Sequence, residues 1–410
     1  MEFKFVNGVN ALNIDMIATV ALAGILLMIG FKIIDKFPIF SRLCIPAPVI
    51  GGFICAIIVW ILRGTNVLQV NMDTTLQLPF MLAFFTCVGF SGSFKLLKSG
   101  GRPFLIFLVS CWILALIQCV VGVGLASALK INPVLGIMAG TVSLVGGHGN
   151  AAAFGPVAEN LGVHGATTVA IASATFGLVV GSVIGGPLGN YLIKKNDLKI
   201  ETEEDTNETL TEQHTDTSDF AEKTFLSHLT LIFLFMFGGI VISDLVLKMN
   251  IKNFALPNYV GAMFLAIIFR NINEKKEIVK LDYKVIDLIL NIGLSFFLTM
   301  AIMTLHIWEL VDLALPLIII LLVQTIILLV FSMFVVFPML GKNYDGAVMT
   351  GGYAGWGLGI AATAVVCMSA ICDKYKVTST KAFLIVPLCG AVFVDVVAIP
   401  TIIFFITKFA

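Results

Sequence analysis

The sequence is poor in charged residues. Only 12% of its 410 residues are Asp, Glu, Lys or Arg, whereas 59% are hydrophobic and the mean hydropathy is +1.02. A soluble domain carries about a quarter charged residues. The formal net charge is zero, so no basic surface for binding nucleic acid is indicated. These values predict a polytopic membrane protein whose surroundings are the lipid bilayer.

Motifs of catalysis and of metal binding by cysteine are also missing. The sequence contains no HExxH, no Ser/His/Asp set and no paired Cys/His spacing, so we do not expect an enzyme. Its eight cysteines lie in or beside apolar segments without a CxxC motif, which indicates small core residues. The first apolar run, 16–34, follows no basic segment and is too long for a cleaved signal peptide. We expect it to be the first membrane span.

Long apolar runs are abundant, and a span needs about 20 such residues. Ten runs fit this length: 16–34, 44–62, 78–94, 103–128, 164–193, 225–247, 255–270, 283–304, 314–338 and 382–407. Two further apolar stretches, 133–160 and 345–371, are rich in glycine, and each precedes the last span of its half. We expect both to be re-entrant hairpins that leave the membrane on the side where they entered.

The distribution of Lys and Arg supports this arrangement. With two hairpins and ten spans, nineteen of the 25 basic residues lie on one side of the membrane and six on the other. Basic loops face the cytoplasm, so both termini are predicted to be extracytoplasmic. The segment 196–224 is acidic, rich in threonine and unable to bury a core, which is typical of a cytoplasmic linker. It separates the predicted domains 1–195 and 225–410.

The two halves repeat weakly. The stretch IPAPVIGGFICAII (45–58) resembles FALPNYVGAMFLAII (254–268), and GGHGNAAAFG (146–155) resembles GGYAGWGLG (351–359). The copies lie 205 to 209 residues apart, and each half has five spans. An odd number of spans inverts the second copy in the membrane. The predicted fold class is therefore an all-α polytopic membrane protein of two inverted five-span repeats, each with a Gly-rich re-entrant hairpin.

Hairpins that enter from opposite sides place their tips near the middle of the bilayer. Broken helices there expose N–H groups, which attract carboxylates, and carbonyl groups, which bind cations. Glycine lets the backbone approach a ligand closely. The candidate substrate-binding glycines are Gly146, Gly147, Gly149, Gly351, Gly352, Gly355 and Gly357. The alternative role of these glycines is close packing of helices.

Polar side chains in the hairpins are further candidates. His148 is predicted to donate to a substrate carboxylate or to carry a proton, or alternatively to bond a neighbouring carbonyl group. Neutral oxygens suit Na⁺, and they also cap broken helices. Side chains with such oxygens are Thr141, Ser143, Asn150 and Thr363.

Asp395 is the most specific candidate. An ionisable group inside an apolar span costs at least about 2.5 kcal/mol and indicates an ion or substrate path. The surrounding span, 382–407, contains no Lys or Arg. A bound Na⁺ would supply the counter-charge, so Asp395 is assigned to a cation site with Thr141, Ser143 and Thr363. The alternative is a protonated, structural aspartic acid.

Four stretches, spread in order over nearly the whole chain, resemble the bacterial sodium/glutamate symporters: FFTCVGFSGSFKLLKSGGRP (84–103), GTVSLVGGHGNAAAFGP (140–156), GGYAGWGLGIAATAVVCM (351–368) and KAFLIVPLCGAVFVDVV (381–397). The resemblance implies secondary active transport by alternating access in the bacterial inner membrane. It also implies a homodimer, Na⁺ as the co-transported ion, glutamate as the substrate and binding at the hairpin tips.

The chain departs from the family pattern inside the candidate site. Asn150 and Phe154 stand where the family usually has Thr and Trp, and Tyr353 and Ala354 replace a His and a branched residue. We include Asn150 and Tyr353 among the candidate substrate-binding residues. The departures leave open a Na⁺- or H⁺-coupled carrier of citrate, malate or aspartate, and a passive channel is a further alternative.

Overall fold

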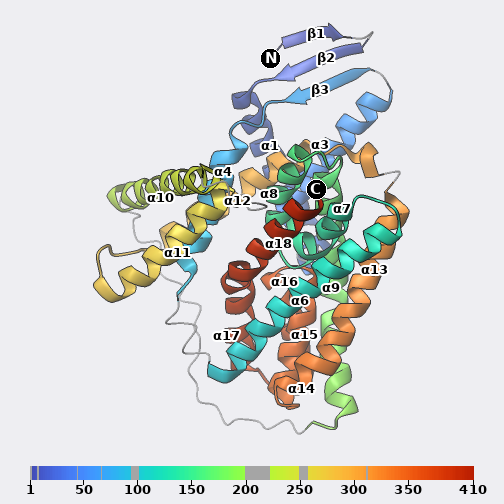
Figure 1. Cartoon of the computed structure of the whole chain (residues 1–410), viewed down its shortest axis with the longest axis vertical. Helices are drawn as coiled ribbons and strands as arrows, with labels where there is room; N and C mark the ends of the chain where they lie inside the picture. Colours follow the sequence, from blue (N-terminus) through green and yellow to red (C-terminus); the bar gives the residue numbers. More distant parts are fainter. Residues whose placement is uncertain are drawn as a thin grey trace.

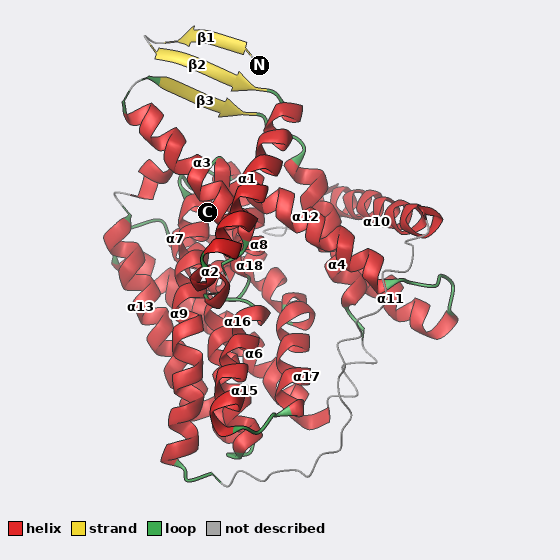
Figure 2. Cartoon of the chain, turned by 180° about the vertical axis from the view of Figure 1, so that it is seen from behind, coloured by secondary structure: helices red, strands yellow, loops and turns green. Residues whose placement is uncertain are grey.

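The structure is a computed structural model in which helices predominate (Figures 1 and 2). It describes residues 2–6, 9–43, 45–65, 67–93, 101–198, 222–248, 257–310 and 313–410. Seven of the described helical segments are long and apolar enough to cross a membrane: Met16–Lys36, Ala47–Gly64, Gly101–Ala128, Ala166–Lys195, Glu222–Val246, Tyr283–Met303 and Ala314–Met339. This confirms a helical, polytopic membrane protein.

The N-terminal part of the chain contains these elements: β1 (Glu2–Val6), β2 (Val9–Ile14), α1 (Met16–Lys36), α2 (Pro38–Arg42), α3 (Ala47–Gly64), β3 (Leu68–Met72), α4 (Gln77–Ser91), α6 (Gly101–Ala128), α7 (Pro133–Ile137), the π-helix η1 (Met138–Val142), α8 (Gly147–Asn160) and α9 (Ala166–Lys195).

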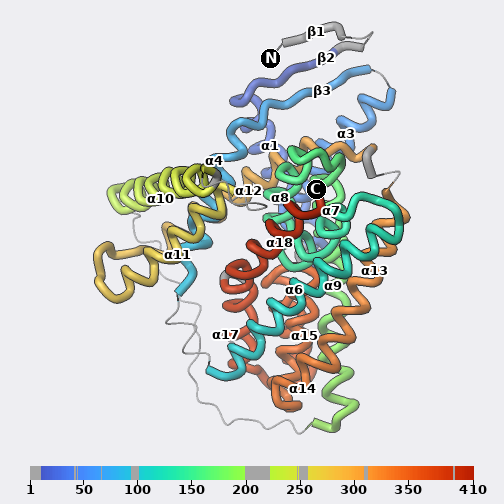
Figure 3. Tube along the Cα trace, viewed as in Figure 1, coloured from blue at the N-terminus to red at the C-terminus, as the bar shows by residue number. Residues whose placement is uncertain are grey.

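The C-terminal part contains α10 (Glu222–Lys248), α11 (Asn258–Lys276), α12 (Tyr283–Met303), the 3₁₀-helix η2 (Ile307–Leu310), α13 (Ala314–Phe331), the π-helix η3 (Ser332–Val336), α14 (Phe337–Met339), α15 (Tyr344–Leu358), α16 (Ala361–Tyr375), α17 (Thr380–Leu388), the π-helix η4 (Cys389–Phe393) and α18 (Asp395–Phe409). Figure 3 shows the trace of the chain through these elements.

Several helices present an apolar face outward, as lipid contact requires. On α13, the side chains at every third or fourth position are exposed, namely Leu315, Ile318, Leu322 and Ile326. Soluble monomers rarely expose a large contiguous apolar face. The three other expected spans coincide with α4, which has only 15 residues, α11, which carries a basic C-terminal end, and the pair α17 and α18, which η4 divides.

The helices form two groups. Group A consists of α1, α3 and α4 with α10, α11 and α12, and group B consists of α6 to α9 with α13 to α18. Helices of one group pack mainly on each other, while α8 against α12 and α4 against η4 are among the few contacts between groups. A cavity of about 150 Å³ separates residues of α8 and α9 from residues of α12. Each group therefore takes helices from both parts of the chain.

A three-stranded sheet, which the sequence analysis did not predict, covers one end of the helices. Strands β1 and β2 pair antiparallel, and β2 and β3 pair parallel, with Ala11 opposite Gln69. The N and C labels both lie toward the end that carries the sheet (Figures 1 and 2). The strands are short and fall outside the apolar runs, so a search for spans does not detect them.

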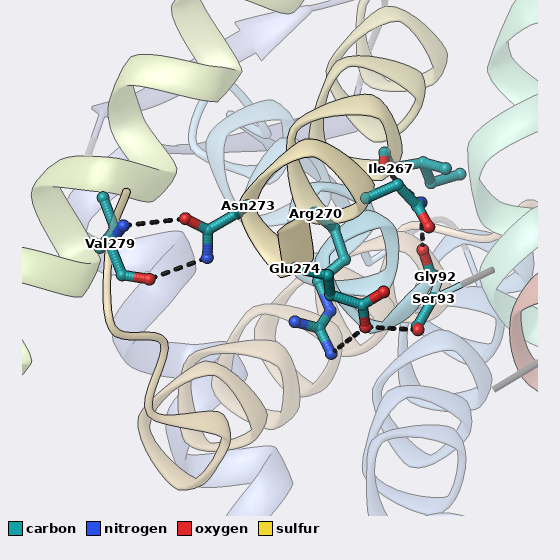
Figure 4. A network of polar contacts seen from close by, with 8 residues as sticks. Gly92, Ser93, Ile267, Arg270, Asn273, Glu274 and Val279 are labelled. Carbon is teal, nitrogen blue, oxygen red and sulfur yellow. Dashed lines mark hydrogen bonds and ion pairs between the residues drawn. The ribbon is translucent and has the colours of Figure 1, made fainter. Parts of the chain in front are cut away.

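A polar network fixes the end of α4 to α11 (Figure 4). Ser93 donates a short hydrogen bond to Glu274, whose carboxylate also pairs with Arg270 at 2.8 Å. The side-chain amide of Asn271 donates to the Gly92 carbonyl oxygen at 2.8 Å. These bonds hold the chain at the point where it leaves group A for group B.

Close backbone contact joins α9 to α15 inside group B. A Cβ added at Gly177 would collide with the carbonyl oxygen of Leu358, and a Cβ added at Gly185 would lie 2.6 Å from the carbonyl oxygen of Gly351. Only hydrogen at these Cα positions permits such an approach. Glycines spaced four or eight residues apart on one helix therefore bring together segments that are far apart in the sequence.

Candidate functional site

The segment from α7 to α8 turns back on itself inside group B. Asn132 caps α7 by accepting a hydrogen bond from the Val134 backbone at 2.9 Å. The helix is interrupted at Gly140, whose φ of −107° and ψ of −120° are not helical. The chain turns after Ser143, and α8 begins at Gly147 with φ of +62°, a left-handed value that favours glycine. The elements α7, η1 and α8 together span Pro133 to Asn160, and the re-entrant course of this segment stays a prediction.

The segment from α15 to α16 also returns to where it began. The Tyr344 hydroxyl, at the start of α15, donates to the Val377 carbonyl oxygen at 2.6 Å, just after α16. The Ser379 hydroxyl donates to the Asp345 carboxylate at 2.7 Å. Both ends of this segment therefore lie together, while α8 and α15 lie toward opposite ends of the molecule (Figure 1).

The two turns meet. A Cβ added at Gly147 would lie 2.5 Å from the Ile360 Cγ2 atom and 3.7 Å from the Gly359 carbonyl oxygen. The starts of α8 and α16 thus face the same place, and neither helix has a side-chain cap. The first N–H groups of a helix have no acceptor within it, and they carry the positive end of the helix dipole. Two such ends converge here, which suits an anion such as a carboxylate.

Oxygen atoms gather beside the same turns. Among the described residues, the buried hydroxyl of Thr363 has no hydrogen-bond partner. A Cβ added at Gly359 would lie 2.8 Å from this hydroxyl oxygen. Asp395 begins α18 directly after the π-helix η4, and it accepts a hydrogen bond of 3.3 Å from the side-chain amide of Asn150 on α8. The structure therefore joins two of the candidates, Asn150 and Asp395, across group B.

Comparisons with known proteins show the family to which the chain belongs. A family model described as "Sodium/glutamate symporter" matches residues 12–377. The chain belongs to the sodium/glutamate symporter family. It is 36% identical over 387 residues to the sodium/glutamate symporter of Escherichia coli (strain K12), covering 94% of this chain and 96% of that protein. It is equally identical over 386 residues to the corresponding protein of Haemophilus influenzae, covering 92% and 94%. The resemblance drawn from the motifs is confirmed.

Membership in this symporter family makes the chain a transporter rather than an enzyme. Within the described ranges, no three His, Cys, Asp or Glu side chains are grouped so that they could hold a metal ion. The oxygens beside the two turns belong to the Thr363 hydroxyl, the Asn150 amide and the Asp395 carboxylate, and oxygen ligands of these kinds suit hard cations.

His148 supports the turn before α8 in this symporter-family chain. Its Nε2 atom lies 2.9 Å from the Thr175 hydroxyl oxygen on α9. That hydroxyl donates its own proton to the Ile171 carbonyl oxygen at 2.9 Å, so Nε2 carries the proton of the His148 contact. The imidazole is buried. The partner is a hydroxyl group on α9 rather than the carbonyl group of the structural alternative, and the role of His148 in substrate binding stays a prediction.

Thr141 and Ser143 tie the π-helix η1 to its neighbours. The Thr141 hydroxyl donates to the Ala115 carbonyl oxygen on α6 at 2.6 Å. The Ser143 hydroxyl contacts the Met138 carbonyl oxygen closely and the Ala170 carbonyl oxygen at 2.7 Å. Both side chains are buried, and both use their protons on backbone oxygens. The Thr141 oxygen also accepts a bond from the Cys119 thiol at 3.3 Å. A role of either hydroxyl in cation binding stays a prediction.

The candidates on α15 lie inside the helix and before its turn. The buried Tyr353 hydroxyl donates to the Ser110 carbonyl oxygen on α6 at 2.8 Å. A Cβ added at Gly351 would lie 2.9 Å from the Gly185 carbonyl oxygen, and one added at Gly355 would lie 2.8 Å from Cys367 Sγ. Gly352 and Gly357 likewise face the side chains of Met368 and Leu328. These residues contact other helices, and the turn itself is formed by Gly359 and Ile360, which the sequence analysis did not select.

Proposed function

We propose that this protein is a secondary active transporter that uses Na⁺ to drive the uptake of glutamate across the bacterial inner membrane. Its curated relatives are named sodium/glutamate symporters and match over more than nine tenths of the chain. The observation that carries the proposal is the convergence of two uncapped helix starts, at Gly147 and Ala361, beside Asn150 and Asp395. Such a place offers N–H groups to carboxylates and oxygens to cations.

The two parts of the chain act as inverted repeats in this proposal. Support comes from their matching order, in which α1, α3, α4, α6, α7–α8 and α9 correspond to α10, α11, α12, α13, α15–α16 and α17–α18. The helices α1 and α3 pack on each other as α10 and α11 do. The segments 133–160 and 344–375 are then re-entrant hairpins from opposite sides. The linker 196–224 joins the repeats, and most of it lies outside the described residues.

Glutamate carries two carboxylates and one ammonium group. One carboxylate binds the N–H groups at the start of α8, around Gly146 to Asn150, and the other binds those at the start of α16. Na⁺ binds near Asp395 and Thr363. Thr141 and Ser143, which precede α8 in the first hairpin, supply further oxygen ligands. The cation offsets the negative charge of both Asp395 and the substrate, so each stabilises the binding of the other.

Alternating access follows from the two helix groups. Group B carries both hairpins, and its contacts with group A are few, so group B moves against group A between two positions. Group A forms the homodimer and stays fixed in the bilayer. The cavity lined by Glu159 and Thr304 lies between the groups and provides the path from the extracytoplasmic side.

The decisive experiment measures glutamate uptake into proteoliposomes against the external Na⁺ concentration at fixed pH. Wild type should accumulate glutamate only when a Na⁺ gradient is imposed. Asp395→Asn removes the charge but keeps one oxygen, so uptake should require far more Na⁺. Asp244→Asn makes the same change at an exposed position of α10 and is the matched control.

The other possible results of this uptake experiment would each point to a different function. An unchanged Na⁺ dependence in Asp395→Asn removes this residue from the cation site. Uptake driven by a pH gradient without Na⁺ identifies a proton-coupled carrier, and uptake of citrate, malate or aspartate in place of glutamate corrects the substrate. Glutamate that only equilibrates across the membrane identifies a passive channel.

The proposed orientation places both termini outside and the linker in the cytoplasm, from the nineteen-to-six distribution of basic residues. Single cysteines at Asn7 and Asp205, positions outside the described residues, test it. A membrane-impermeant thiol reagent added to intact cells should label only the first. The seven native cysteines in the described ranges are all buried, so this part of the chain adds little background labelling. Labelling at Asp205 would contradict the orientation.

A further inference from the structure

Two glutamines are buried where the helices of the two repeats cross. Gln118 lies in α6 and Gln324 in α13, and both side chains are fully buried. The Gln118 amide nitrogen donates to the Gly357 carbonyl oxygen at 3.3 Å, next to the end of α15. The Gln324 side-chain amide nitrogen donates to the backbone carbonyl oxygen of Gln118 at 2.9 Å. The pair therefore connects α6, α13 and the second hairpin.

The oxygen atoms of both side chains have no partner. Each Nε2 faces a carbonyl oxygen, which can only accept, so the amide orientation is fixed by chemistry. Within the described ranges, Gln118 Oε1 and Gln324 Oε1 are both buried and accept no hydrogen bond. An unsatisfied buried acceptor costs about 1–3 kcal/mol, and hydrocarbon offers no donor to relieve it. The two side chains belong to one cluster, since Gln324 Nε2 bonds to the Gln118 backbone. An unfilled acceptor oxygen on each of them indicates a missing ligand.

The glutamines lie against the break in the first hairpin. A Cβ added at Gly140 would be 3.0 Å from the Gln118 carbonyl oxygen and 3.1 Å from Gln324 Nε2. Gly140 has non-helical backbone angles, and the carbonyl oxygens of Met138 and Gly140 accept bonds from the Ser143 hydroxyl and the Ser143 backbone N–H. A carbonyl oxygen has two lone pairs, so each of these oxygens keeps one for a cation. The next residue, Thr141, bonds to α6 one turn before Gln118. Acceptor oxygens therefore predominate here, and the two amide donors are already used.

We propose that Gln118 Oε1, Gln324 Oε1 and the carbonyl groups at the Gly140 break bind a second Na⁺, separate from the one near Asp395. Neutral oxygens match a monovalent hard cation, whereas a divalent cation would require carboxylates. The proposal rests on the proposed Na⁺-driven transport. Because Gln118 also holds the end of α15, the ion orders both hairpins together. Binding of this ion then favours binding of the substrate at the site between the two turns. In this way Na⁺ binding is coupled directly to substrate binding.

The test uses full-length protein purified in detergent, without glutamate. The melting temperature is measured against NaCl, with choline chloride holding the ionic strength constant. Gln118→Leu and Gln324→Leu each remove one oxygen, and the Na⁺ concentration for half-maximal stabilisation should rise at least tenfold. Thr325→Val is the matched control, since this neighbouring hydroxyl already donates to the Leu321 carbonyl oxygen. Its Na⁺ response should equal that of wild type.

A further variant at Gln324 keeps the test informative if the leucine variants misfold. Gln324→Glu keeps a ligand oxygen, so it should retain the stabilisation by Na⁺ that Gln324→Leu loses, and it decides the question if the leucine variants do not fold. A buried water between the two oxygens predicts an unchanged Na⁺ midpoint in both leucine variants, which would overturn the proposal. In that case Na⁺-driven uptake by wild type would still stand. If wild type shows neither Na⁺ stabilisation nor Na⁺-driven uptake, the proposed function itself fails.

Discussion

Replacing Gly185 by alanine tests the contact between α9 and α15. The new methyl group would lie 2.6 Å from the Gly351 carbonyl oxygen and 2.6 Å from Cys367 Sγ, closer than nonbonded atoms approach. The next residue of the same helix, Gly186, is the matched control. A methyl group there would meet Ala370 Cβ at 3.6 Å, which is an ordinary contact.

The difference in stability between the two variants measures the cost of the steric overlap alone. Both substitutions gain the same helix propensity, about 1 kcal/mol for alanine over glycine, so this gain cancels between them. Overpacking a filled interior costs about 1–3 kcal/mol, and here a backbone oxygen on one side cannot rotate away. We expect Gly185→Ala to be less stable than Gly186→Ala by this amount.

The assay is thermal melting of both variants and wild type, purified in the same detergent and followed by tryptophan fluorescence. Gly186→Ala should melt at or above wild type, and Gly185→Ala several degrees below Gly186→Ala. Equal melting of the two variants would refute the close backbone contact between α9 and α15.

Two further substitutions test other contacts. Tyr353→Phe removes the hydrogen bond to Ser110, so stability should fall by about 0.5–1.5 kcal/mol with an unchanged glutamate KM in vesicles; a raised KM would instead assign the hydroxyl to the substrate. Glu274→Gln removes the charge that Ser93 and Arg270 share, so thermal stability should fall by about 1.5–3 kcal/mol. A melting temperature equal to that of wild type would show that this network does not hold α4.

The long helices were predictable because hydrocarbon demands continuous apolar sequence over the thickness of the bilayer. The expected span 103–128 corresponds to Gly101–Ala128, and 164–193 corresponds to Ala166–Lys195. The start of the first Gly-rich stretch carries a further signal that the sequence analysis did not use, because Asn132 followed by proline favours a helix start, and α7 begins there.

The second turn was harder to locate, because glycine serves two purposes in the same segment. Sequence similarity aligned the GGYAG motif with GGHGN, which placed the turn at the start of that motif. In the structure Gly351 and Gly355 pack against helices α9 and α16, and the chain turns only at Gly359. The signal for this packing was present in α9, where glycines recur at 177, 181, 185 and 189. Gln118 and Gln324 do not stand out in the sequence, because the mean hydropathy of a long apolar span changes little when it contains one polar residue.

The contact between α9 and α15 also bears on how the protein is made. Synthesis delivers α9 and the whole linker before α15 exists, so during that interval the glycine face of α9 has lipid or another helix against it. A stripe without side chains packs poorly against lipid tails, and the N-terminal half cannot complete its interior alone. Assembly therefore waits for the last part of the chain. Two halves expressed as separate polypeptides would have to find each other before either became resistant to proteolysis.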